Sequence, residues 1–166
     1  SDLSLLQLYC CDVIMLSDLR TNRDRIGRTR RILEAAVHDE WKLLTNIPAV
    51  GGRPIGIGVL VHLSLNPHTT QLNLTRPEHT PDEWHQAVDG QIMHLEIKRP
   101  HAPKVVWIVG IYQHVAKPEN AMKRQIVLQC LAAIKEQAAI SGKCLLILGD
   151  INAAPAGGRW RTPPNS

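Results

Sequence analysis

The chain has 166 residues, of which 44% are hydrophobic and 20% are charged. This is the size and balance of one folded domain, and it excludes a disordered chain. Phenylalanine is absent, so the core has to be mainly aliphatic. The net charge is +4. No apolar run is long enough to span a membrane and no signal peptide is visible.

The first half of the chain predicts two strands separated by a helix. Apolar residues near the start are consistent with the end of a helix over residues 3–10. The run Asp12–Leu16 then predicts a short buried strand, with Asp18 just beyond it. The elements expected next are a helix near 29–44, a Pro/Gly-rich loop over 46–54, a strand over 55–65 and a polar connection from 66 to about 76.

The second half predicts three strands and the strongest helix of the chain. A helical turn is expected over 81–87, a half-exposed strand over 91–98, a hairpin connection over 99–104 and a strand over 105–112. Apolar residues at every fourth position, from Met122 to Ala138, predict a helix over 117–141 that Gly142 ends. The aliphatic run before Gly149 predicts a strand buried on both faces.

Strands that alternate with helices indicate an α/β (α+β) layered fold with a mixed sheet. We expect the core over residues 1–152 and an irregular tail over 153–166. Both ends look cut within the architecture. The four cysteines, Cys10, Cys11, Cys130 and Cys144, lie in apolar surroundings without zinc-binding spacing. We interpret them as reduced core thiols of an intracellular protein, nuclear or cytoplasmic.

Polar residues follow three of the predicted strands. Asp150 and Asn152 end the last strand, and in extended backbone residues i and i+2 would face the same cleft. Gly149 would allow close approach of the backbone there. Asp18 and Tyr112 end two earlier strands. Carboxylates at strand ends could hold a divalent cation and orient a water for attack on phosphorus. The same residues are also typical of plain turns.

Arginine is concentrated in one short segment, where residues 20–31 contain six arginines and one aspartate. Such a cluster favours contact with a polyanion such as DNA, and a solvated helix face is the alternative. The candidate nucleic-acid-binding residues are Arg20, Arg23, Arg25, Arg28, Arg30 and Arg31.

Five collinear segments resemble motifs of the endonuclease/exonuclease/phosphatase superfamily, the fold of DNase I and the apurinic endonucleases. They are Asp12–Asp18, Ile57–Val61, Asp89–Ile92, Val109–Tyr112 and Leu148–Asn152. The last of these, continued as Ala-Ala-Pro-x-Gly-Gly-Arg-Trp, most resembles the endonuclease domains of retrotransposon-type mobile elements.

The resemblance implies a DNase I-like sandwich and Mg²⁺- or Mn²⁺-dependent cleavage of DNA by water. Asp18 would replace the metal-binding glutamate of the family, Asp150 would orient or activate the water, and Asn152 and Tyr112 would hold the phosphate. The aspartate at position 18 is one methylene shorter than glutamate, and Gln113-His114 replaces the usual small residues.

The first strand of the family and its catalytic histidine segment would lie outside residues 1–166. We therefore expect the isolated chain to be catalytically crippled even if the parent is active. The alternatives are a non-catalytic nucleic-acid-binding scaffold and a phosphatase of phosphoinositides or other small phosphoesters.

Overall fold

The computed structural model describes residues 11–17, 19, 21, 25–36, 40–47, 56–74, 84–114 and 117–152. Its strands are β1 (Val13–Leu16), β2 (Trp41–Asn46), β3 (Ile57–His62), β4 (Thr69–Leu72), β5 (Ile92–Ile97), β6 (Val106–Tyr112) and β7 (Cys144–Asp150). Its helices are α1 (Ile26–Ala36), α2 (Trp84–Val88) and α3 (Ala121–Ile140), with short 3₁₀ turns η2 (Asn66–His68) and η3 (Pro118–Asn120).

The strands form two sheets. One has the order β1-β3-β2 and is antiparallel throughout. The other has the order β4-β5-β6-β7, in which only β6 and β7 are parallel. A parallel pair requires a crossover, and here α3 connects the two strands. The expected mixed-sheet α+β fold is confirmed.

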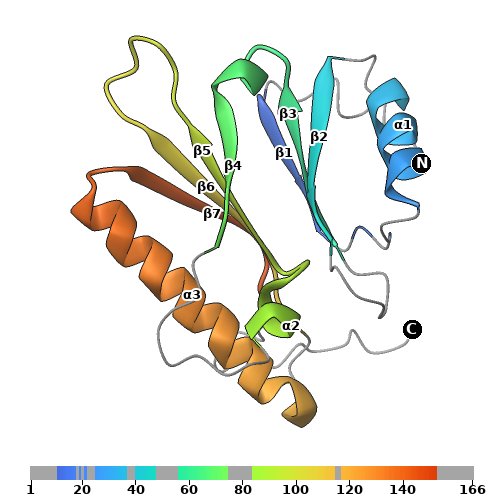
Figure 1. Cartoon of the computed structure of the whole chain (residues 1–166), viewed down its shortest axis with the longest axis vertical. Coiled ribbons are helices and arrows are strands. Elements are labelled where there is room, and N and C mark those ends of the chain that lie inside the picture. The colour runs from blue at the N-terminus through green and yellow to red at the C-terminus, as the bar shows by residue number, and fades with distance from the viewer. Residues whose placement is uncertain are drawn as a thin grey trace, which may run out of the picture.

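The elements pack as four layers, with the two sheets face to face and helices on the outer faces (Figure 1). The core between the sheets joins β3 residues such as Val59 to Met93 and Leu95 of β5. Helices α2 and α3 cover the other face of the four-stranded sheet, where Ile111 of β6 packs with Ile126 of α3. Helix α1 packs on the outer face of the three-stranded sheet.

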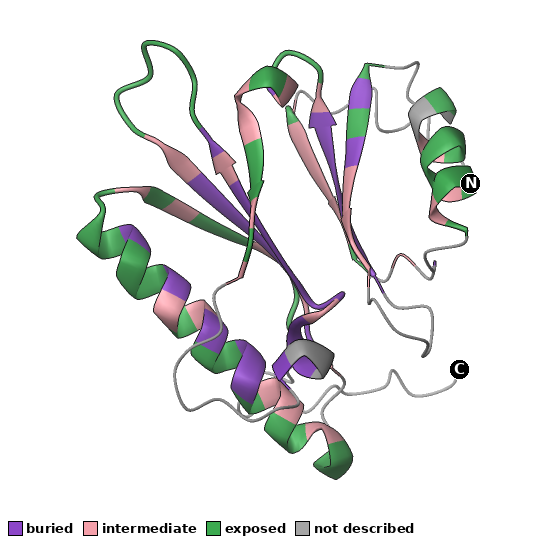
Figure 2. Ribbon diagram, in the orientation of Figure 1, coloured by how far each residue is buried: buried purple, intermediate pink, exposed green. Residues whose placement is uncertain are grey.

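The long helix forms as its spacing predicts. Ile126, Cys130, Ile134 and Ala138 are buried at every fourth residue, and Gly142 follows the helix with φ of +63°. That left-handed conformation is open to glycine at little cost. Met122, the first residue of the predicted apolar face, is exposed because α3 extends there beyond the sheet (Figure 2).

Two predicted boundaries in the first half are wrong. The helix expected near 29–44 ends at Ala36, and residues 41–46 form β2, in which Trp41 and Leu43 are buried and Lys42 is exposed. That alternation has the period of a strand and overrides the helical pattern before it. The polar connection expected from 66 contains β4, whose pairing with β5 compensates for its lack of apolar residues.

The burial expected for two strands is also wrong. Strand β5 was expected to be half-exposed, yet it is almost entirely buried because its sheet is covered on both faces. Strand β7 was expected to be buried on both faces, yet in the described part of the chain it lies at the sheet edge and is largely exposed (Figure 2). Cys144 at its start is exposed and is therefore no core thiol, whereas Cys130 is buried and Cys11 is partly buried.

Several expectations fall on residues that the structure does not describe. These are the helix over 3–10, Cys10, most of the 46–54 loop and the tail over 153–166. No helix in the described part of the chain has the length and hydropathy needed to cross a membrane.

Candidate active site at the ends of β6 and β7

Tyr112 and Asp150 lie side by side at the carboxyl ends of the parallel strands β6 and β7. They are partners in the strand register, and the next backbone amide, that of Gln113, donates to the Asp150 carbonyl oxygen at 2.8 Å. Alternation from Ile108, which packs between the sheets, places Tyr112 on the face turned toward β1 and β3. Asp150 is the register partner of Tyr112 and follows Leu148, which packs between the sheets, by two residues. Two of the predicted site residues are thus brought together.

Gly149 allows β7 to approach β6 and β1 closely, as predicted. Its φ is +141°, and a Cβ at this position would overlap the carbonyl oxygen of Ile111 and lie 2.7 Å from Cε of Met15. Any side chain would therefore push β7 away from its neighbours. Because Met15 belongs to β1, the same contact brings the carboxyl end of β1 beside the carboxyl end of β7.

The turn after Asp150 departs from the extended geometry on which the sequence argument relied. Asn152 has a φ of +44°, and its backbone amide donates to Oδ1 of Asp150 at 2.8 Å. Its side-chain Nδ2 donates to the Gln113 carbonyl oxygen at 2.6 Å. Asn152 is therefore held beside Asp150 by an Asx turn rather than by strand alternation. It also connects the segments that follow β6 and β7.

Arg124 of α3 supports this turn, and sequence reasoning missed it. Its Nη1 donates to the carbonyl oxygens of His114 and of Asn152, the latter at 3.3 Å. The side chain of Gln113 is buried and donates to the Arg124 carbonyl oxygen at 3.3 Å. No spacing in the sequence could identify Arg124, because its partners lie 10 and 28 residues away. Gln113 was visible only as a departure from the family pattern.

His114 belongs to the same support, since its carbonyl oxygen accepts from Arg124. Its Nε2 contacts the Ala87 carbonyl oxygen at 3.3 Å. Burial lowers the pKa of His114, and the hydrogen bond to Ala87 opposes that effect. The neutral imidazole is therefore favoured.

The proposed metal ligand, Asp18, lies outside the described residues. Its neighbours are placed, since β1 ends at Leu16 and the amide of Leu19 donates to the Gly56 carbonyl oxygen at 2.7 Å. Within the described ranges, no group of three or more His, Cys, Asp or Glu side chains is arranged to hold a metal. Mg²⁺ needs only one or two carboxylates and keeps several waters. Asp150 with one further carboxylate would fit it.

The arginines do not gather around this site. Arg25 directly precedes α1, and Arg28, Arg30 and Arg31 lie on it with exposed side chains. Helix α1 covers the outer face of the three-stranded sheet, on the side away from β6 and β7 (Figure 1). Arg20 and Arg23 lie outside the described residues.

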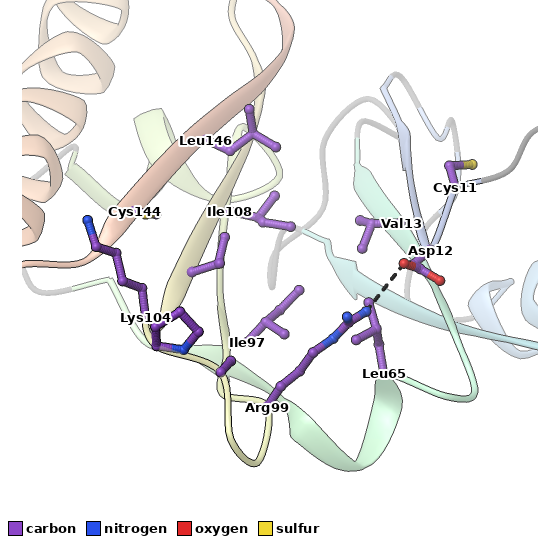
Figure 3. Close-up of a pocket in the computed structure, with 13 residues that line it drawn as sticks. Cys11, Asp12, Val13, Leu65, Ile97, Arg99, Lys104, Ile108, Cys144 and Leu146 are labelled. Atoms are coloured by element: carbon purple, nitrogen blue, oxygen red, sulfur yellow. Dashed lines mark hydrogen bonds and ion pairs between the residues drawn. The ribbon is translucent and has the colours of Figure 1, made fainter.

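A cavity of about 600 Å³ opens at the opposite end of the strands from Tyr112 and Asp150 (Figure 3). Its walls are mainly apolar and include Val13, Ile108 and Leu146. An ion pair of 3.3 Å between Arg99 and Asp12 lies at its edge. This cavity is separated by the length of the strands from Tyr112 and Asp150, and it brings no catalytic set of side chains together.

No protein-family model matches the sequence, and the search of curated proteins found no match. Solved structures do share its fold. ANGEL2, described as a 2′,3′-cyclic phosphatase in complex with adenosine-2′,3′-vanadate, superposes with a TM-score of 0.58 at 16% identity, over 92% of this chain and 43% of its own. D. rerio TDP2, complexed with a single-strand DNA product, superposes with a TM-score of 0.53 at 14% identity, over 92% of this chain and 52% of its own.

The human Nocturnin catalytic domain with bound sulfate anion gives a TM-score of 0.53 at 16% identity, over 92% of this chain and 56% of its own. The chain thus spans about half the length of these structures. All three belong to the endonuclease/exonuclease/phosphatase superfamily. The chain has the DNase I-like fold of that superfamily, as its motifs predict.

Proposed function

We propose that the chain is the core of a divalent-metal-dependent phosphoester hydrolase. The observation that carries this proposal is the register pair Tyr112–Asp150 at the shared carboxyl end of β6 and β7, beside the end of β1. Ligands of layered α/β sheets bind where the carboxyl ends of strands meet. The neighbours support the reaction class, since one is described as a cyclic phosphatase and another is complexed with a DNA product.

Each side chain has a role that its chemistry allows. The Asp150 carboxylate orients the attacking water and accepts its proton. The Tyr112 hydroxyl donates to a phosphoryl oxygen. Asn152 uses one amide N–H for the Gln113 carbonyl, and its second N–H is available for the phosphate. Asp18 would hold the metal beside Asp150. Mg²⁺ or Mn²⁺, when bound, neutralises charge that develops on the non-bridging oxygens.

We assign DNA as the substrate and an endonuclease of a mobile element as the parent. The support is the TDP2 complex with single-strand DNA, the net charge of +4 and the motif that follows Asp150. The arginines of α1 would contact DNA away from the reaction site, because α1 covers the opposite sheet. A phosphatase of small phosphoesters is the alternative that the resemblance to ANGEL2 favours.

A non-catalytic nucleic-acid-binding scaffold is the second candidate. The observation that favours it is the bonding of Asn152, whose amide already joins two chain segments. In addition, Asp150 is the one carboxylate at the β6–β7 ends within the described ranges. A scaffold of this kind would bind through exposed side chains such as Arg28 and Arg30.

The two candidates separate when Asp150→Asn is compared with Asp12→Asn. Asp12 is an exposed aspartate at the opposite end of the strands. For a hydrolase, Asp150→Asn lowers Mg²⁺-dependent cleavage of single-stranded DNA about 100-fold or more and changes DNA affinity less than twofold, while Asp12→Asn changes neither. The isolated chain is expected to cleave only slowly, so cleavage is followed with protein in excess over DNA. A wild-type chain that binds DNA but shows no Mg²⁺-dependent cleavage even then supports the scaffold, and the hydrolase proposal is then wrong for this chain.

A further inference from the structure

A second, more polar cavity lies beside the first residues of β5. Its volume is about 310 Å³, at the lower end of the range of ligand pockets, which is about 300–1,000 Å³. It therefore has room for one ring system rather than for a large ligand. The polar and aromatic side chains that line it are Asn46, Gln71, Asn73, Asp89, His94 and Trp84.

The cavity exists because β4 is shorter than β5 at this end. The last β4–β5 pair is Leu72–His94, so Ile92 extends beyond the end of β4. Asn46 of β2 reaches the freed edge and donates from Nδ2 to the Ile92 carbonyl oxygen at 2.6 Å. Gln71 and Asn73 are exposed at the rim, while Ile92 and His94 are buried in the wall.

The wall contains a buried polar atom that has no partner within the described ranges. His94 is 5% exposed, and its Nε2 makes no hydrogen bond there. The ring is fixed by an edge-to-face contact with Trp107 at 4.5 Å between centroids. Burial is the largest effect on His94 and lowers its pKa, so the neutral imidazole offers one acceptor and one donor. Leaving such a group unsatisfied costs free energy that a ligand can recover.

We infer that this cavity binds an amino-bearing nucleobase, with adenine the best match. Side-chain amides of Gln and Asn pair in two places with the amino group and ring nitrogen of adenine. The Asp89 carboxylate can only accept hydrogen bonds when ionised, so it selects a ligand that carries an amino donor. The buried aromatic side chains Trp84 and His94 also line the cavity and would give a base ring contacts.

The cavity lies at the same end of the four-stranded sheet as Asp150, which fits a nucleic-acid strand that crosses the strand ends. The residue before Ile92 is Gln91, whose carbonyl oxygen accepts from the Tyr112 amide at 2.8 Å. Strand β6 alone separates β5 from β7. Because Ile92 pairs with Ile111 and Ile111 pairs with Gly149, the base pocket and Asp150 lie at the same end of one sheet. The idea that the base belongs to a nucleic-acid strand rests on the proposed function, whereas the binding of a free nucleoside does not.

The test is an NMR titration of the 166-residue chain with adenosine and, as a matched probe, purine riboside, which lacks only the 6-amino group. EDTA is present throughout, because neither ligand carries a phosphate or needs a metal. With adenosine we expect saturable chemical-shift changes at Asp89 and His94. Purine riboside should bind at least about tenfold more weakly, because it lacks the hydrogen bond from the 6-amino group to the Asp89 carboxylate.

A variant at the cavity rim and a control variant outside the cavity show whether adenosine binds in this cavity. The double variant Gln71→Ala/Asn73→Ala weakens adenosine binding at least about tenfold. The control Thr70→Ala changes an exposed β4 residue that does not line the cavity and leaves binding unchanged. Equal binding of the two ligands, no binding of either, or unchanged binding by the double variant would each overturn the inference. Because no phosphate or metal is involved, these results are independent of the cleavage assay with Asp150→Asn.

Discussion

Strands β6 and β7 are parallel neighbours of seven residues each, with similarly aliphatic sequences, yet their surroundings differ. The five central residues of β6 are buried, whereas most of β7 is exposed, including Leu146 at 47% and Ile147 at 44%. The difference arises from position, because β6 has a strand on either side and β7 forms the edge among the strands that the structure describes. An aliphatic run therefore shows that a strand forms, while the sheet order decides whether it is buried. At their carboxyl ends both strands finish in a polar residue, and these two residues, Tyr112 and Asp150, are partners in the strand register.

The largest effect is expected where β7 closes on β6. Gly149→Ala should lower the free energy of unfolding by about 4 kcal/mol, which combines positive-φ strain with overpacking against the backbone of Ile111. Gly142→Ala is the matched control, because its φ is also positive but no atom lies within 4 Å of the added Cβ. It should cost about 1 kcal/mol. Urea denaturation measures both, and equal losses would contradict the close approach of the two strands.

An identical truncation in each strand tests the comparison itself. Ile111→Ala in β6 removes a side chain that is 0% exposed and should cost about 3 kcal/mol. Ile147→Ala in β7 should cost less than about 1 kcal/mol, because that side chain already meets solvent. Midpoints from urea titrations, at unchanged slope, give the two values. If Ile147→Ala is as costly as Ile111→Ala, then β7 is covered and the edge assignment fails.

A smaller effect, the loss of stability at low pH, is expected from two histidines, His94 and His114. Burial lowers the pKa of His94 from its usual 6.5, and burial likewise lowers that of His114. The unfolded chain therefore binds more protons than the folded chain just below pH 6.5, and the stability that the neutral rings provide is lost as pH falls through their folded pKa values. Thermal unfolding between pH 7.5 and 5 should show this loss.

His94→Gln should reduce that slope, and His94→Gln/His114→Gln should reduce it further. The comparison uses the change in stability with pH, so any constant cost of the substitutions cancels. A slope that is the same in all three proteins would show that neither imidazole is kept neutral by burial.

The sequence predicted what depends on local pattern and failed where tertiary context decides. Helix α3 was correct because its apolar residues repeat every fourth position along its length. Strand β2 was missed because only Trp41 and Leu43 alternate with polar residues, directly after a helix. The exposure of β7 could not be predicted, since it depends on how many strands join the sheet.

For the site, motif spacing brought Tyr112, Asp150 and Asn152 together, yet it misjudged how Asn152 is held. A residue at φ +44° leaves the strand alternation on which the argument depended. Arg124 could not be found, because it binds backbone carbonyl groups and so leaves no pattern of matching side chains. Arginines on α1 form a cluster in sequence, but α1 packs against the three-stranded sheet, whereas Asp150 belongs to the four-stranded sheet.

The central claim is that the ends of β1, β6 and β7 form one cation-and-phosphate site. Addition of Mn²⁺ to the chain, followed by paramagnetic broadening of assigned amide signals, tests it most directly. We expect selective broadening at Tyr112, Asp150, Asn152 and the residues just after Leu16. Signals near Asp12 and Cys144, at the other ends of β1 and β7, should be unaffected. Broadening that is absent at Tyr112 and Asp150, or that centres on the Asp12 end, would contradict it.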